Sequence, residues 1–110
     1  MDKNISEQLT PFLPLIRKYV AKLKNDRLSI QEVFVFGSRA KGMAKGDSDI
    51  DLCVISPNFE NRDKAIDYLW SKRDREEILA GLEPLGYNPK DFVDEDPMVW
   101  EIKTTGVRIE

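Results

Sequence analysis

Apolar side chains recur at steps of three and four residues along the first quarter of the chain, the spacing that places side chains on one face of an α-helix. These residues are Ile5, Leu9, Phe12, Leu13, Ile16, Val20 and Leu23. Thr10 followed by Pro11 is typical of a helix start, so we predict a firm helix from about Thr10 to Lys24. Pro14 either kinks the first turn of this helix or delays its start by one step.

Further along, the pattern alternates between strand and helix. β-branched and aromatic runs at 31–36 and 49–55 predict two buried strands, joined by a turn and a glycine-containing loop. Apolar residues at helical spacing predict the longest helix over 62–82. Glycine and proline mark the segment that follows this helix. The last predicted elements are a short strand at 91–94, a helix at 98–105 with Asp96 as its N-cap, and a closing strand at 107–110.

The order of these elements is helix, strand, strand, helix, strand, helix, strand. It predicts an α/β (α+β) fold class, in which helices flank a small mixed β-sheet. A chain of 110 residues allows one domain, so we expect residues 1–110 to form a single domain.

Composition then excludes several classes of chemistry. The chain has no histidine and one cysteine, Cys53, which rules out histidine-based triads, histidine-ligated zinc and an internal disulfide. The 17 basic residues against 20 acidic ones give a net charge of −3, and no extended nucleic-acid-binding surface is evident. Apolar runs are far shorter than the roughly 20 residues that span a bilayer, and Met1–Asn4 does not begin a signal peptide, so we expect a cytoplasmic protein without a membrane segment. Any chemistry must come from carboxylates, hydroxyls, lysine or arginine, and metal ions.

The densest group of such residues surrounds the predicted second strand. Asp49 and Asp51 are two residues apart at its start, so both carboxylates should lie on one face, where a cation such as Mg²⁺ would relieve their repulsion. Gly37 and Ser38 follow the first strand and could let backbone N–H groups and a hydroxyl bind a phosphate, with cationic charge added by Arg39 and Lys41. Taken alone, an acid pair at a strand edge is more often solvated surface charge.

The motif itself resembles a known signature. Gly37-Ser38-x-Ala40-x-Gly42, five residues and then Ser48-Asp49-x-Asp51-Leu52 is similar to the GSxAxG…SDxDL signature of the minimal nucleotidyltransferases, in the DNA polymerase β-like superfamily.

This resemblance implies the polymerase β-like nucleotidyltransferase fold and transfer of a nucleoside monophosphate, AMP from ATP being the expected case, to an acceptor hydroxyl with release of pyrophosphate. It implies that Gly37 and Ser38 hold the β- and γ-phosphates, and that Asp49 and Asp51 ligate one or two Mg²⁺ ions. We expect Arg39, Lys41 and Ser48 to contribute to the nucleotide site as well.

The family often has a third acid on a neighbouring strand, where it completes the metal site and helps to deprotonate the acceptor. We expect Asp91 to be this residue, since it starts the predicted strand at 91–94 where the family usually places the acid. Asp94 would lie on the opposite strand face, and Asp96 is expected to cap a helix. The alternative for Asp91 is a polar residue that enters a strand after a turn.

The resemblance also implies a partner. Larger relatives carry extra domains that choose the acceptor, and this chain has no room for one, so acceptor recognition would come from a partner protein or a second copy of the chain. The family's usual companion is a small helical HEPN protein, and the two often form a toxin–antitoxin pair. A second hypothesis is therefore an antitoxin or regulatory module that neutralises its partner by binding, with little or no catalysis.

Overall fold

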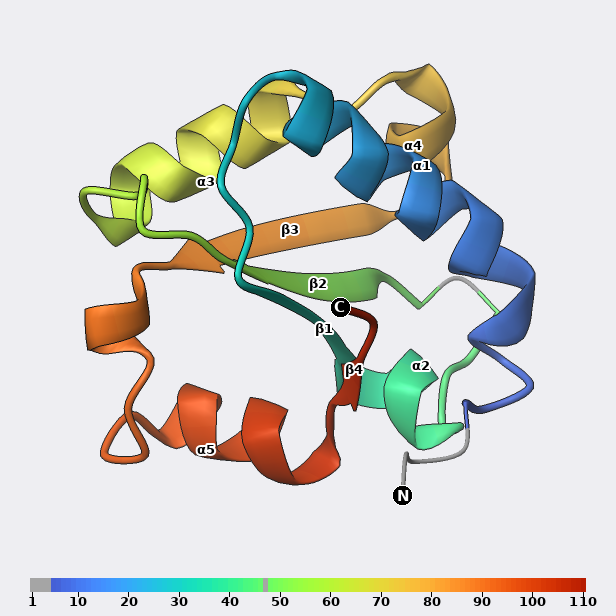
Figure 1. The fold of residues 1–110 in the computed structure, drawn as a ribbon. Coiled ribbons are helices and arrows are strands. Elements are labelled where there is room, and N and C mark those ends of the chain that lie inside the picture. The colour runs from blue at the N-terminus through green and yellow to red at the C-terminus, as the bar shows by residue number, and fades with distance from the viewer. Residues whose placement is uncertain (1–4, 47) are drawn as a thin grey trace.

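Four strands form one mixed sheet with helices on both faces (Figure 1). The computed structural model describes residues 5–46 and 48–110; residues 1–4, which bear on the signal-peptide prediction, lie outside this range. The strands are β1 (Glu32–Phe36), β2 (Ile50–Ile55), β3 (Leu82–Tyr87) and β4 (Val107–Arg108), in the spatial order β3-β2-β1-β4. β1 is antiparallel to β2 and β4, whereas β2 and β3 are parallel. The predicted fold class is confirmed.

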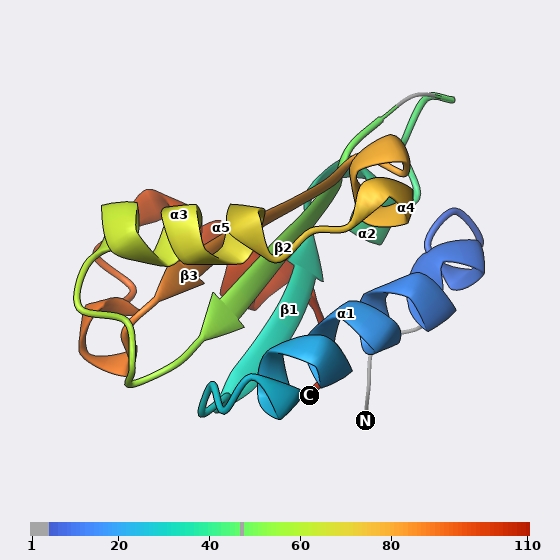
Figure 2. The same ribbon diagram turned by 90° about the horizontal axis from the view of Figure 1, so that it is seen from above.

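The helices divide between the two faces of this sheet. They are α1 (Leu13–Asn25), α2 (Gly37–Lys41), α3 (Arg62–Ser71), α4 (Arg75–Leu79) and α5 (Pro97–Thr105), with 3₁₀ turns at Thr10–Phe12 and Pro89–Asp91. α1, α3 and α4 lie over one face, whereas α5 covers the other and α2 sits at the end of β1 (Figures 1 and 2). Among the helices of the described residues, none combines the length and apolar character that crossing a membrane requires.

Strand alternation builds a hydrophobic core on each face. Toward α1 and α3 the buried side chains include Val33, Val35, Leu52, Val54, Ile16, Val20, Leu23 and Leu69. Toward α5 they include Phe34, Phe36, Cys53, Ile55, Val99 and Ile102. Because both faces are covered, β1 and β2 read as nearly continuous apolar runs. Burial also raises the pKa of the Cys53 thiol to about 12, which makes it an inert core residue.

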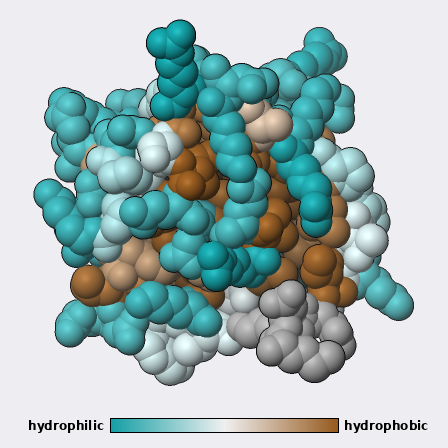
Figure 3. Space-filling model, viewed as in Figure 1, coloured by the Kyte–Doolittle hydropathy of each residue, from teal (hydrophilic) through white to brown (hydrophobic). Residues whose placement is uncertain are grey.

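Solvated charge covers much of the outside. On the face seen in Figure 3, hydrophilic side chains lie over most of the surface, and apolar surface shows between them. This agrees with a sequence in which 34% of residues are charged.

The prediction of one helix over 62–82 is wrong after Ser71. α3 ends at Ser71, and Asp74 starts α4 through a capping box with Glu77. Residues 82–87 then form strand β3, because Gly81 adopts φ +80° and turns the chain into the sheet.

β3 tolerates a proline because it is an edge strand. Pro84 has no N–H to donate. Its backbone nitrogen and carbonyl point away from β2, so no hydrogen bond between β2 and β3 is lost. Trp70 Nε1 donates to the Pro84 carbonyl at 2.9 Å, and Arg73 Nη1 donates to the Leu82 carbonyl at 3.0 Å. These side chains cap the outer edge of β3 and leave it less open to pairing with another strand.

The prediction of a strand at 91–94 is also wrong. Asn88 accepts from the Lys90 N–H and starts a 3₁₀ turn over Pro89–Asp91, after which residues 92–96 lie outside any strand. The helix that follows is confirmed, with Asp96 accepting from the Met98 N–H at 2.9 Å.

Two details of the first half also differ from prediction. Thr10 lies inside a 3₁₀ turn rather than capping α1, which starts at Leu13 with a proline in its first turn. The segment after β1 was predicted as a turn and is the short helix α2, which ends at Gly42 with φ +74°.

The end of α1 generates a stability prediction. Leu28 N–H donates to the Leu23 carbonyl and Arg27 N–H to the Lys24 carbonyl, the pattern of a Schellman motif. Arg27 holds φ +70°, a conformation that favours glycine, and its side chain is exposed. Arg27→Gly should raise the free energy of unfolding by about 0.5–1 kcal/mol in urea denaturation. Arg27→Ala, which removes the same side chain and keeps the strain, is the control; an equal gain in both variants would contradict this explanation.

Candidate active site

The two aspartates of the motif lie where β2 begins. Asp49 precedes β2 and is exposed, whereas Asp51 is its second residue and is partly buried. A Cβ on Gly37 would lie 2.2 Å from Asp51 Oδ2, and a Cβ on Gly81 would lie 3.3 Å from Asp49 Oδ1. Each carboxylate therefore rests against a glycine of a neighbouring segment, one from the end of β1 and one from the start of β3.

A third acid stands beside this pair. Glu83 of β3 is in register with Asp51, and in a parallel sheet residues in register project to the same face. The pKa of Glu83 is raised by burial first and then by the negative charges of Asp49 and Asp51, while Arg73 opposes the shift. The pKa of Asp51 is raised by burial, by Asp49 and by Glu101 of α5. These carboxyl groups are close enough to oppose one another's ionisation.

The structure does not bring Asp91 to this group. β3 runs parallel to β2 and ends at Tyr87 opposite Ile55, and Asp91 lies in the 3₁₀ turn beyond that end. At a rise of about 3.3 Å per residue, the four steps from Asp51 to Ile55 alone span roughly 13 Å. Asp91 cannot share a cation with Asp51 in this arrangement.

Sequence reasoning missed Glu83 because its strand was assigned to a helix and its exit. The signal that could have found it is the alternation of side chains between the two faces of the sheet along Leu82–Tyr87. Leu82 is buried in one core and Tyr87 in the other, and Glu83 lies on the same face as Tyr87. Pro84 and Gly86 concealed this alternation, since both residue types usually interrupt a strand.

The predicted phosphate-binding residues have different positions. Gly37 and Ser38 begin α2 directly after β1, beside Asp51, in keeping with a role at the site. Lys41 is exposed at the end of α2. Ser48 precedes Asp49, and its Oγ accepts from the Lys45 N–H at 2.8 Å.

Arg39 is not free to bind a phosphate. Its side chain is 8% exposed, and its Nε and Nη2 donate to the Ser48 carbonyl at 3.1 and 2.8 Å. Its guanidinium also lies over the Phe12 ring, 4.5 Å from the ring centroid. Arg39 therefore holds the segment that enters β2, and through it the acid pair.

A cleft opens beside Asp49. Its volume is about 470 Å³, within the usual range for small-molecule sites. It is lined by Phe12, Arg39, Gly46, Ser48, Asp49, Leu79, Ala80 and Gly81. Apolar side chains from the 3₁₀ turn before α1 and from the end of α4 thus face a cleft that Asp49 lines.

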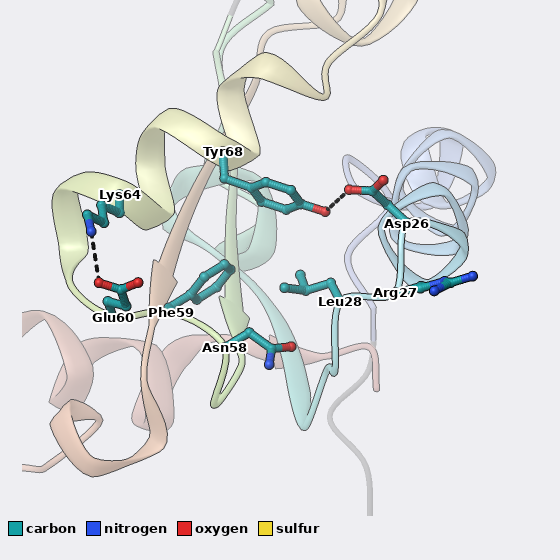
Figure 4. A pocket seen from close by; sticks show the side chains of 8 residues that line it. All are labelled: Asp26, Arg27, Leu28, Asn58, Phe59, Glu60, Lys64 and Tyr68. Carbon is teal, nitrogen blue, oxygen red and sulfur yellow. Dashed lines mark hydrogen bonds and ion pairs between the residues drawn. The ribbon is translucent and has the colours of Figure 1, made fainter.

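A second pocket, of about 260 Å³, lies at the other end of the strands (Figure 4). Tyr68 reaches from α3 to Asp26, with a hydrogen bond of 2.6 Å, above Phe59 and Leu28. Lys64 also pairs with Glu60 in this pocket, which lies beyond the far end of β2, away from the two aspartates of the motif.

The three carboxyl groups of the site suit a hard divalent cation. Mg²⁺ commonly binds one or two carboxylates and completes its shell with water and phosphate oxygens, and Asp49, Asp51 and Glu83 offer that donor chemistry. Within residues 5–46 and 48–110, no three histidine, cysteine, aspartate or glutamate side chains already form a metal-binding group.

Comparison with known proteins places the chain in a family. The family model described as "Nucleotidyltransferase domain" matches residues 14–108. The chain belongs to this nucleotidyltransferase family. The match spans every strand of the sheet and all three acids of the site.

A solved structure shares the family fold. The crystal structure of a protein from Sulfolobus solfataricus described as a "putative nucleotidyltransferase" matches with a TM-score of 0.65 and 18% identity, covering 93% of this chain and 82% of that one. At this identity the likeness shows the fold alone. A search of curated proteins found no match.

The close contact at Gly37 yields a prediction for this nucleotidyltransferase. Gly37→Ala places a Cβ against Asp51 Oδ2 at φ +79°. The carboxylate can rotate away, so we expect unfolding free energy to fall by about 1–2 kcal/mol from the left-handed backbone, and the NMR chemical shifts of Asp51 to differ from those of the wild type. Gly46→Ala is the control, because a Cβ there meets nothing within 4 Å. Unchanged Asp51 shifts in Gly37→Ala would refute the contact.

Burial of the Asp51 carboxyl group, together with repulsion from Asp49 and Glu101, predicts a loss of stability that depends on pH. The pKa of Asp51 is raised in the folded protein, so the folded state binds more protons and stability falls as pH rises from about 4 through the raised pKa. Asp51→Asn should therefore raise the metal-free Tm at pH 7 by about 2–4 °C, and the gain should vanish near pH 4. Thermal unfolding at both pH values measures this, with Asp67→Asn, an exposed aspartate of α3, as the control. A gain that is independent of pH would count against electrostatic repulsion.

Proposed function

We propose that this protein is an Mg²⁺-dependent nucleotidyltransferase that transfers a nucleoside monophosphate, AMP from ATP being the expected case, to an acceptor hydroxyl. The observation that carries the proposal is the parallel register of Asp51 with Glu83, next to the Gly37–Ser38 turn. Three neighbouring carboxyl groups, one of which (Asp49) lines a cleft of about 470 Å³, supply what nucleotidyl transfer needs, namely positioning and charge neutralisation. We also propose that residues 1–110 act as one minimal domain.

Each residue has a distinct role in this proposal. Asp49 and Asp51 would hold Mg²⁺, with Glu83 in place of Asp91 as the third carboxylate. Bound Mg²⁺ would neutralise charge on the triphosphate and on the leaving pyrophosphate. Gly37 and Ser38 would bind phosphate oxygens through backbone N–H groups and the hydroxyl.

Glu83 is also the proposed proton acceptor. The acceptor oxygen forms a bond to the α-phosphorus, the bond from the α-phosphorus to the pyrophosphate oxygen breaks, and the hydroxyl proton moves to Glu83. A carboxylate placed beside the acceptor can serve as the general base for this step.

We propose that the acceptor is carried by another protein, with a HEPN-type partner of a cytoplasmic toxin–antitoxin pair as the specific hypothesis. Exposed apolar side chains beside the cleft support a macromolecular contact there: Leu79 is 74% and Ile78 51% exposed. A second copy of the chain is the alternative occupant of that surface.

The second candidate function is a binding module that neutralises its partner without catalysis. The observation in its favour is that Asp91, the third acid expected from the family resemblance, lies away from Asp49 and Asp51. Both candidates retain the same fold and partner, so activity of acid-to-amide variants separates them.

The assignment of Glu83 over Asp91 gives the decisive comparison. With Mg²⁺, radiolabelled ATP and the product of the neighbouring gene as acceptor, Glu83→Gln should lower the rate of label transfer by about 10²–10⁴-fold, whereas Asp91→Asn should stay within about twofold of wild type. The readout is radiolabel on the acceptor after gel separation.

Acceptor-independent binding serves as the control. Mg²⁺ with ATP at millimolar concentration should raise the Tm of the wild type and of Asp91→Asn, and should fail to do so in the Asp49→Asn, Asp51→Asn double variant. Neutralisation of the partner that survives this double variant would favour the binding module. Loss of transfer in Asp91→Asn, with Glu83→Gln active, would overturn the proposed site.

A further inference from the structure

Helix α4 is attached to the protein through a buried charge. Of its five residues, all of them described, Glu77 is the buried one, and its side chain is 1% exposed. Ile78 and Leu79, the apolar residues of the helix, face outward. Glutamate is almost never fully buried without a partner, so the contacts of Glu77 decide where α4 sits.

Those contacts join α4 to α1. Glu77 Oε1 accepts from Lys22 Nζ at 2.7 Å and from the Asp74 N–H at 2.8 Å. Lys22 Nζ also donates to the Lys72 carbonyl at 2.8 Å and lies 3.6 Å from Asp74 Oδ2. One ammonium group from α1 therefore holds both sides of the break between α3 and α4.

The far end of α4 leads directly into the candidate active site. Leu79, Ala80 and Gly81 line the cleft. The Gly81 carbonyl accepts from the Ile50 N–H at 2.8 Å, between Asp49 and Asp51, and the Gly81 backbone lies against the Asp49 side chain. Two residues later the chain reaches Glu83. A shift of α4 would therefore move the cleft wall and the start of β3 together.

Folding stability alone does not explain the ion pair between Lys22 and Glu77. Glu77 Oε2 is buried and has no hydrogen-bond partner among residues 5–46 and 48–110. Replacing a buried ion pair by apolar residues of similar volume is often neutral or stabilising. The directional bonds of Lys22 and Glu77, however, fix one position for α4, a short helix that buries no apolar side chain of its own.

We propose that Lys22 and Glu77 are positioning residues for the nucleotide cleft, holding α4 so that the Ala80–Gly81 backbone is placed against Asp49. The inference rests on the proposed function for its nucleotide readout. Neither residue touches the reacting groups; both act through the backbone of α4 and Gly81.

The test replaces the pair by an apolar pair. In Lys22→Met, Glu77→Leu, unfolding free energy in urea should be retained or raised, whereas the dissociation constant for ATP with Mg²⁺, measured by calorimetry, should rise about 5- to 50-fold. Hydrogen exchange of the Ile50 amide should also become faster, because its acceptor is the Gly81 carbonyl. If the double variant is too unstable to study, Glu77→Gln removes the charge with a nearly isosteric side chain and should show the same changes to a smaller degree.

Two control variants separate positioning from general stability. Val99→Ala weakens the other core and should lower stability without changing ATP affinity. Lys64→Met, Glu60→Leu removes an exposed pair of 2.8 Å and should change neither quantity.

The outcomes are distinguishable. Wild-type ATP affinity and Ile50 exchange in the double variant and in Glu77→Gln would overturn the proposal, as would an equal loss of affinity in Val99→Ala at matched stability. If the wild type itself does not bind ATP with Mg²⁺, the proposed function fails, and the exchange of Ile50 still decides whether the pair positions Gly81.

Discussion

The parallel pairing of β2 with β3 is the constraint on which the rest of the structure depends. It places Glu83 level with Asp51, and a slip of one residue would turn Glu83 to the opposite face. Two sets of contacts hold the register: the bond from the Ile50 N–H to the Gly81 carbonyl at 2.8 Å, and the bonds from Trp70 and Arg73 to the outer carbonyls of β3. The site is therefore assembled by a contact between strands that lie about thirty residues apart in the chain.

The same contact has an electrostatic cost. Asp51 and Glu83 both have raised pKa values, because each is partly buried and each faces like charge. The cores on the two faces of the sheet offset this cost, and the glycines at 37 and 81 make room for the carboxylates without relieving their repulsion. A site that is destabilised when empty of cations is one that gains stability when a cation and a phosphate bind.

Charge is used differently at α4, a few residues away. There the buried carboxylate of Glu77 pairs with the Lys22 ammonium, so attraction between opposite charges fixes the position of α4. At the acid site, by contrast, like charges repel one another. Arg39 plays a similar part on the other side of the cleft, where it binds the Ser48 carbonyl and stacks on Phe12. Two segments that line the cleft are thus held in place by contacts of the cationic side chains of Lys22 and Arg39.

The sequence by itself determined what depends on neighbouring residues: strands β1 and β2, the Asp96 cap of α5, the mixed sheet, and the spacing of Gly37, Ser38, Asp49 and Asp51 around one turn. These features follow from local periodicity, caps and strand alternation. Only the tertiary structure decided that Leu82–Tyr87 is a strand, that Glu83 rather than Asp91 joins the aspartates, and that Arg39 holds a loop. The physical reason is that Pro84 is acceptable only where a strand has an unpaired edge, and which strand lies at the edge is set by packing between distant segments.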